Sequence, residues 1–183
     1  MSPRYLYYTA MALDGFLADE HDSLDWLMVQ PIDEEGPMNY TAFIAGIGAL
    51  AMGATTYRWL LDHNEATNEA WPYQIPAFVF THGDPPLVAD NITVLDGAPA
   101  DHRAELETAA AGKDVWVVGG GDLASQFASD GMLDEIVVSI APVMLGAGRP
   151  LFTRPYDLEL VELDRNRAFA CARYRVVGPR TAQ

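Results

Sequence analysis

A run of three glycines is the local feature of this chain that most suggests chemistry. Gly119–Gly121 stands between the apolar run Val115–Val118 and a stretch that opens with Asp122. Backbone N–H groups without side chains at such a strand end can approach a ligand closely, and the N-terminus of a following helix favours an anion. The run lacks both the Gly-x-Gly-x-x-Gly spacing and a Walker lysine, so phosphate binding and a tight strand-to-helix turn are equally good interpretations.

Two other segments repeat this arrangement of small or polar residues after an apolar stretch. Gly53–Thr56 follows the apolar segment Ile47–Met52, and its hydroxyls suit either a helix cap, the commoner role, or a phosphate contact. Thr81 and His82 follow Phe78–Phe80. The carboxyl ends of parallel strands meet at one edge of a sheet, where open α/β folds bind their ligands. Together, the three segments predict a ligand-binding crevice.

Other kinds of catalytic site find little support in the sequence. The single cysteine, Cys171, excludes an intramolecular disulfide and a zinc site built from cysteines, and we expect this thiol to be buried. No Gly-x-Ser-x-Gly motif supports a hydrolase triad. The histidines lack the spacing of metal ligands, so no metal site is expected. They are His21, His63, His82 and His102.

Composition and charge restrict the partners. The 183 residues carry 26 Asp and Glu against 11 Lys and Arg, a net charge of −15 that repels phosphate backbones and anionic lipid headgroups. Nucleic acid and membrane surfaces are therefore not expected as partners. The first residues show no charged leader before a long apolar core, and no apolar run approaches the roughly 18 residues of a membrane span, so we expect a cytoplasmic protein.

Short apolar runs that alternate with amphipathic stretches must position these residues. Strands are expected at Tyr5–Leu13, Ile47–Met52, Pro76–Thr81, Ile92–Leu95, Val115–Val118 and Asp134–Ala141. Helices are expected at Asp22–Gln30, Asn39–Ile47, Thr55–Leu61, Ala100–Ala111 and Asp122–Phe127. The tail predicts an antiparallel hairpin that turns at 164–168. No linker or repeat divides the chain, which predicts a single three-layer α/β domain over residues 1–183 with a mixed sheet.

Six motifs follow one another along nearly the whole chain. They are Ala12-Leu13-Asp14-Gly15-Phe16-Leu17-Ala18, Leu24-Asp25-Trp26-Leu27, Met52-Gly53-x-x-Thr56-Tyr57, Val117-Val118-Gly-Gly-Gly121-Asp-Leu123, Leu133-Asp134-Glu135-Ile136 and Ala141-Pro142-Val143-x-Leu145-Gly146-x-Gly148-x-Pro150-Leu151-Phe152. Together they resemble the dihydrofolate reductase superfamily, and more closely the reductase domain of the bifunctional riboflavin-biosynthesis deaminase-reductase and its stand-alone relatives. The resemblance implies a three-layer α/β/α fold with a mostly parallel central sheet.

The same resemblance implies a reductase in which NADPH passes a hydride to a small, planar heterocyclic acceptor. Ala10 and Leu17 would supply backbone contacts to the nicotinamide carboxamide. Thr81 and His82 would lie near the adenosine ribose and its 2′-phosphate. The pyrophosphate would lie between the two glycine junctions. Thr55 and Thr56 would meet the pyrophosphate on one side, and Gly119, Gly120, Gly121, Asp122 and Leu123 would cradle it on the other. The resemblance also implies Gly53, Ala54 and Val118 as cofactor-binding positions.

At the substrate end the resemblance places Asp14 and Trp26 as catalytic residues. Phe16 and Tyr57 would join Trp26 in an apolar, aromatic surface that suits a flat ring better than a charged phosphate ester. A water or an acid such as Asp14 would deliver the proton. An aspartate before glycine also suits a simple turn, and a tryptophan here also suits the core.

Departures from the family pattern keep other interpretations open. Ala54 stands where related reductases place an Arg that helps to hold the 2′-phosphate, so NADH is an alternative to NADPH. Tyr8 and Val118 replace a Lys and a Glu of the riboflavin-pathway enzymes, so that pathway's own reaction is an alternative but not the favoured one. A non-catalytic nucleotide-binding or interaction module is a third interpretation. The resemblance also implies a homodimer, with 136–143 and 151–152 as candidate interface or, equally, core segments.

Overall fold

An apolar first strand, β1 (Tyr5–Ala12), lies in the middle of the sheet. Alternate side chains of a strand point to opposite faces, so Tyr5 and Tyr7 pack into one core cluster while Leu6 packs into a second. Both faces of β1 are therefore covered, as a parallel strand inside an α/β fold requires. The computed structural model describes residues 2–181 of the chain.

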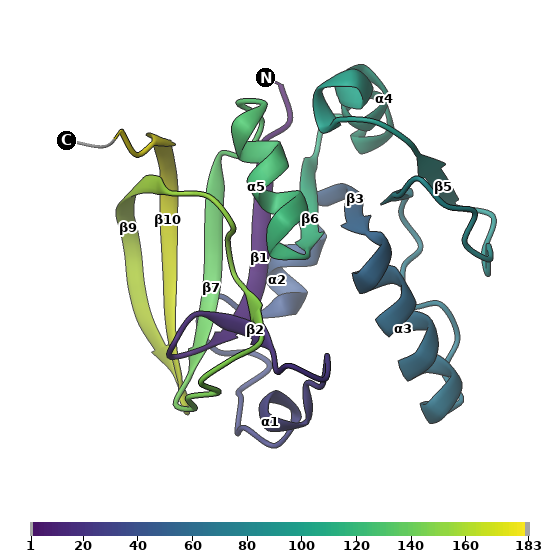
Figure 1. Ribbon diagram of the computed structural model, residues 1–183. Coiled ribbons are helices and arrows are strands. Elements are labelled where there is room, and N and C mark those ends of the chain that lie inside the picture. The colour runs from purple at the N-terminus through teal and green to yellow at the C-terminus, as the bar shows by residue number, and fades with distance from the viewer. Residues whose placement is uncertain (1, 182–183) are drawn as a thin grey trace.

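Within residues 2–181 the main sheet has eight strands in the order β5-β4-β3-β6-β1-β7-β10-β9 (Figure 1). Neighbours from β5 to β7 run parallel, and β10 and β9 are antiparallel to the strands beside them. This mixed, mostly parallel sheet confirms the predicted fold class, with β6 in a central position. The other strands are β2 (Phe16–Ala18), β3 (Ile47–Gly53), β4 (Ala77–Phe80), β5 (Ile92–Leu95), β6 (Asp114–Gly119), β7 (Glu135–Ala141), β8 (Arg149–Pro150), β9 (Tyr156–Asn166) and β10 (Phe169–Pro179).

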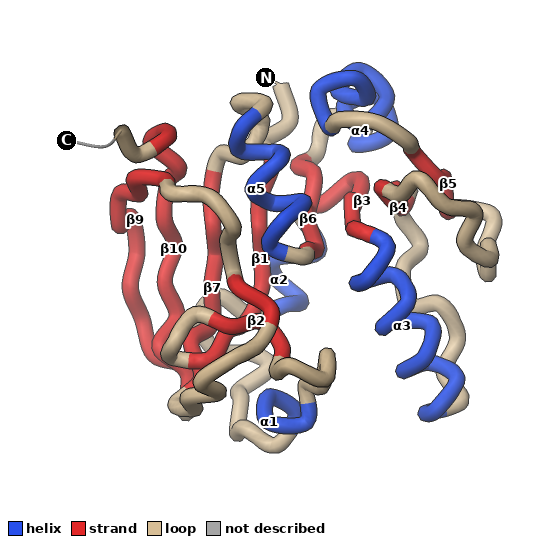
Figure 2. Tube along the Cα trace, viewed as in Figure 1, coloured by secondary structure: helices blue, strands red, loops and turns tan. Residues whose placement is uncertain are grey.

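Helices cover both faces of the sheet, which makes three layers; Figure 2 shows α5 in front of the sheet and α2 behind it. Leu106 and Phe127 join the cluster on one face, and Phe43 and Tyr57 join the cluster on the other. Leu106 and Phe127 are fully buried, and each such side chain contributes about 1.5–3 kcal/mol to folding. The helices are α1 (Asp25–Met28), α2 (Tyr40–Ala45), α3 (Ala54–Thr67), α4 (Arg103–Ala110) and α5 (Gly121–Ser129).

The first helix is shorter than the sequence predicts. Of the expected segment 22–30, only residues 25–28 are helical. The Asp19 carboxylate accepts hydrogen bonds from the backbone N–H groups of His21 and Ser23. Asp22 has a left-handed backbone with φ of 61°. These two features hold residues 19–23 in a turn, so the helix can begin only after this turn.

Two other helices differ from the predicted lengths. α3 continues past Leu61 to Thr67, and Asn68 closes it with φ of 56°. Its last turns carry few apolar side chains, which is why the sequence pattern ended early. The helix predicted over 100–111 begins as a 3-10 turn, Pro99–His102, that leads into α4.

The tail forms the predicted hairpin from β9 and β10. β7 lies between β1 and β10, and residues Ile136–Val138 are at most 3% exposed, so this part of the candidate interface 136–143 is core, whereas Pro142 is exposed. Leu151 and Phe152 pack against the same core. Exposed apolar side chains lie instead on the edge strand β9, where Leu160 and Leu163 are 52% and 65% exposed. The homodimer stays a prediction, for which β9 offers the better surface.

Candidate functional site

Three strand ends meet at the carboxyl edge of the sheet. Gly53 of β3 pairs with Phe80 of β4, and Met52 of β3 pairs with Gly119 of β6. The three strands are parallel and adjacent, so the segments that follow them leave the sheet at the same level. The structure thus brings together the three segments that the sequence singled out.

The two glycine junctions face each other across this edge. A Cβ atom on Gly53 would lie 3.8 Å from the Gly119 carbonyl oxygen, and one on Gly119 would lie 3.9 Å from Thr56 Oγ1. Gly119 has φ of 138°, a conformation that L side chains rarely adopt, and the Gly119–Gly120 peptide bond is cis. No atom of residues 2–181 beyond its chain neighbours lies within 4 Å of a Cβ on Gly120. Bare backbone therefore borders open space here.

Helices α3 and α5 both begin at this space without a side-chain cap. Their N-cap residues are Gly53 and Gly120, and in the described chain neither helix start receives a side-chain capping hydrogen bond. The capping role that the sequence favoured for Thr55 and Thr56 is therefore not observed. Uncapped N–H groups and the partial positive charge of two helix starts suit this edge to an anion.

Because Gly121 has no side chain, the segment 150–151 can pack directly against the start of α5. A Cβ atom on Gly121 would overlap the backbone carbonyls of Pro150 and Leu151, so this segment crosses the start of α5 in close contact. The Ser125 hydroxyl donates to the Gly121 carbonyl at 2.8 Å and accepts from the Thr153 N–H at 2.9 Å. The sequence analysis did not predict a site role for Ser125 or for residues 150–151. The Gly-x-Gly-x-Pro-Leu-Phe motif was a signal for the second of these.

Thr81 and His82 reach the same edge but already have neighbours. Thr81 Oγ1 accepts the Gly83 N–H at 3.0 Å, and His82 Nδ1 lies 2.5 Å from Asp96 Oδ1. The His82 side chain is 91% exposed. Asp96 adds a negative charge beside His82, which opposes the binding of a 2′-phosphate there. The contact of these residues with the cofactor stays a prediction.

Asp14 joins two loops. Its Oδ2 accepts the backbone N–H groups of Leu145 at 2.9 Å and Gly146 at 2.7 Å. The hydrogen bond from Gly146 is the largest of the effects that lower the pKa of Asp14, because it stabilises the carboxylate. Its Oδ1 is buried without a hydrogen-bond partner among residues 2–181. A carboxyl held ionised is a poor acid near neutral pH, which argues against the prediction of Asp14 as a proton donor.

Replacing Asp14 with alanine is expected to lower stability at neutral pH and to have a smaller effect in acid. The folded-state pKa lies below the unfolded one, so the stabilisation is fully present above the unfolded value and is lost as the pH falls through the folded value. Urea unfolding of both proteins at pH 7 and near pH 3 measures this. An equal difference in unfolding free energy at both pH values would show that the carboxylate charge does not contribute.

The aromatic surface predicted at the substrate end does not include Tyr57. Tyr57 is 1% exposed and donates its hydroxyl to the Pro86 carbonyl at 2.6 Å, so it is a core residue. Trp26 on α1 donates its indole N–H to the Ser23 carbonyl at 3.2 Å. Its ring packs against a third apolar cluster, which is formed by Ala141, Phe169 and Cys171. Phe16 lies on the short strand β2. The predicted contact of Tyr57 with a substrate is therefore wrong, because its ring is enclosed.

The two remaining positions of the predicted nicotinamide end lie on β1 and β2. Ala10 pairs with Ser139 of β7, and Leu17 packs its side chain against the first core cluster.

Between α1 and α3 lies a cavity of about 160 Å³, lined in part by Trp59 and His63. These two rings stack with centroids 4.8 Å apart.

Other kinds of site are not seen in the described chain. Residues 2–181 contain no group of three or more His, Cys, Asp or Glu side chains arranged to hold a metal ion. Cys171 is buried, as predicted. None of the helices in the same residues is long and apolar enough to cross a membrane.

The sheet and its paired glycine junctions define a dihydrofolate-reductase-like α/β domain. The chain belongs to the RibD C-terminal domain family, whose model matches residues 4–177, and it is thus a member of a reductase-like family. It is 29% identical over 153 residues to the uncharacterized protein YwjB of Bacillus subtilis, covering 83% of this chain and 84% of that one.

Solved structures share the fold. A Shewanella sp. PV-4 protein provisionally assigned to riboflavin biosynthesis superposes with a TM-score of 0.79 and 24% identity, covering 97% of this chain and 99% of that one. A Thermotoga maritima diaminohydroxyphosphoribosylaminopyrimidine deaminase/5-amino-6-(5-phosphoribosylamino)uracil reductase superposes with a TM-score of 0.64 and 15% identity, over 96% of this chain and 57% of that one. At these identities the similarity extends to the fold alone.

Proposed function

We propose that this protein is an NADPH-dependent reductase that transfers a hydride to a small heterocyclic acceptor. The main support for this proposal is that two uncapped helices, which start at Gly53 and Gly120, begin next to an open space at the carboxyl edge of the sheet. The domain that carries them belongs to the RibD C-terminal family. The Thermotoga relative is named a reductase of a ribosylaminouracil, which supports this class of reaction.

The residues present fit a dinucleotide cofactor. The bare backbone at Gly120 leaves room for a pyrophosphate, and the first N–H groups of α3 and α5 would donate to it. Thr55 and Thr56 carry hydroxyls at the same place. Bound here, the reduced nicotinamide would supply the hydride. The chain itself would position the ring and the acceptor in contact and exclude water from between them.

The local chemistry favours an acceptor other than the riboflavin-pathway substrate. Tyr8 stands where that pathway's enzymes have a lysine, and its ring stacks on Phe43 with centroids 4.1 Å apart. Burial raises the pKa of Tyr8 to about 12, so it stays neutral and donates its hydroxyl to the Met38 carbonyl at 2.9 Å. Val118 packs into the second core cluster. Neither side chain offers the charge that a phosphorylated pyrimidine would pair with.

Titration with NADPH and NADH tests the proposal. We expect NADPH to bind with a dissociation constant in the micromolar range, seen as quenching of tryptophan fluorescence and energy transfer to the nicotinamide. Bound NADPH should then be oxidised by a pterin, a flavin precursor or a quinonoid compound in a screen of acceptors. Stronger binding of NADH would correct the cofactor, in keeping with Ala54 in place of an arginine.

Two other results would change the assignment. Rapid reduction of the ribosylaminopyrimidine substrate would make this the riboflavin-pathway enzyme itself. If neither nucleotide bound, the reductase proposal would fail, and a non-catalytic interaction module on the same fold would replace it.

A further inference from the structure

An ion pair joins two segments that lie far apart in the sequence. Arg149 Nε donates to Asp22 Oδ1 at 2.5 Å, and Arg149 Nη2 donates to Asp22 Oδ2 at 2.9 Å, across 127 residues of chain. This two-point geometry is the one that an arginine fork also makes with a phosphate group. Both side chains stay accessible to solvent, Arg149 at 57% and Asp22 at 40% exposure.

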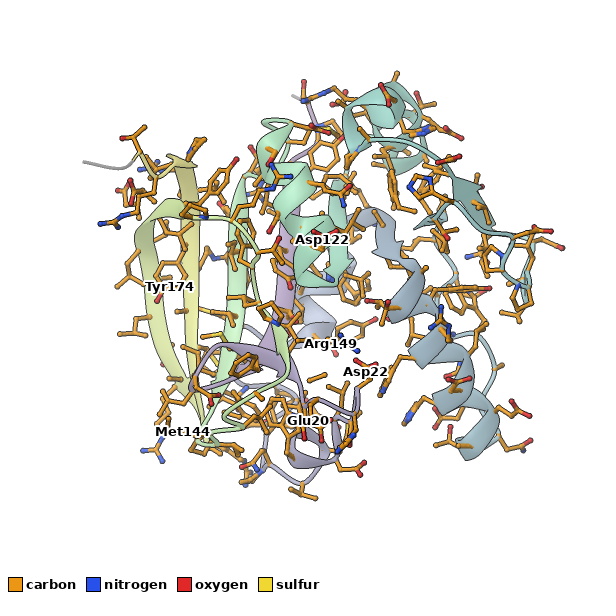
Figure 3. The ribbon with its side chains drawn as sticks, viewed as in Figure 1. Glu20, Asp22, Asp122, Met144, Arg149 and Tyr174 are labelled. Carbon is orange, nitrogen blue, oxygen red and sulfur yellow. The ribbon has the colours of Figure 1, made fainter. Side chains whose placement is uncertain are left out.

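This ion pair lies beside the edge of the sheet where α3 and α5 begin. Arg149 directly precedes Pro150, whose carbonyl lies against Gly121 at the start of α5. Figure 3 shows Asp22 and Arg149 facing each other between α5 and α3. A second cation comes from α3, where Arg58 lies one helical turn beyond Ala54 and helps to lower the pKa of Asp22, after the larger effect of Arg149.

We propose that Arg149 is a binding site for a phosphate group, and that Asp22 occupies it as an internal anion until that phosphate displaces it. The inference rests on the proposed function where the phosphate is that of the nicotinamide cofactor. In a chain with 11 Lys and Arg against 26 Asp and Glu, Arg149 provides a local positive charge that the molecule as a whole does not.

Two substitutions distinguish a phosphate-binding arginine from an ion pair that only holds two loops together. Arg149→Gln removes the cation, and Asp22→Asn removes the competing anion while keeping a residue that tolerates the left-handed backbone. The matched control is Arg180→Gln, which breaks another exposed ion pair, to Asp157 at 3.1 Å, near the C-terminus. Calorimetric titration of each full-length protein would use NADPH, ribose 5-phosphate and inorganic pyrophosphate as probes.

We expect Arg149→Gln to weaken binding of a phosphate probe about tenfold or more, and Asp22→Asn to strengthen it about threefold. The control should bind like the wild type. A change confined to NADPH and pyrophosphate assigns the site to the cofactor, and a change confined to ribose 5-phosphate assigns it to the acceptor. Thermal unfolding without ligand should show all variants folded, because exposed ion pairs contribute little to folding.

The opposite pattern overturns the inference. If Asp22→Asn weakens binding as much as Arg149→Gln, the pair is a structural tie between loops. If Arg149→Gln binds all three probes like the wild type, the arginine does not contact phosphate. These outcomes differ from failure of the proposed function, in which the wild type binds neither nicotinamide nucleotide while pyrophosphate still distinguishes the variants.

Discussion

Replacing Gly121 with alanine should destabilise the protein by about 3 kcal/mol and lower its melting temperature by roughly 6–12 °C. The added Cβ overlaps the backbone carbonyls of Pro150 and Leu151, which cannot rotate away as a side-chain end can. The sign is informative, because alanine is otherwise the better helix former by up to about 1 kcal/mol. Thermal and urea unfolding measure the effect. Cofactor binding should weaken as well, since the displaced segment carries Arg149.

Gly178 provides a matched control for this prediction. It lies in β10, has no described atom within 4 Å of a Cβ position, and has a backbone that other residues can adopt. Gly178→Ala should therefore unfold within about 0.5 kcal/mol of the wild type. If Gly121→Ala were as stable as this control, the close crossing of 150–151 over α5 would be wrong.

Replacing Gly120 with aspartate should weaken NADPH binding about 100-fold or more while leaving the fold intact. Gly120 is the N-cap of α5, a position where aspartate is among the preferred residues, and it borders open space. Its carboxylate would both fill the space of the pyrophosphate and repel it. The same charge at a helix N-terminus is favourable, so the melting temperature should stay unchanged or rise. Fluorescence titration and thermal unfolding of the same samples give both numbers.

Gly120→Asn separates the effect of size from that of charge. Asparagine has nearly the same shape as aspartate and is an equally good N-cap, so we expect it to weaken binding about tenfold through volume alone. If Gly120→Asp bound NADPH like the wild type, the cofactor would not lie at this edge. A large loss of stability in either variant would mean that the space beside Gly120 is filled.

Local patterns in the sequence determined the strands and the class of site. The apolar run Val115–Val118 and the glycines after it define a buried strand that ends in a helix start, because only a few neighbouring residues decide that geometry. The junction after Ile47–Met52 is the same case. Strand ends in a parallel sheet share one edge, so these local features were enough to predict that the glycine junctions lie together.

Only the tertiary structure decided which side chains reach that edge. The ring of Tyr57 follows a site motif in the sequence, yet the packing of α3 encloses it at 1% exposure. Asp14 is held ionised by N–H groups of a loop 131 and 132 residues away, and Asp22 meets Arg149 across 127 residues. No local pattern encodes such contacts. They arise because β8 folds back against β2 and α5, and that return path is set by the packing of the whole sheet.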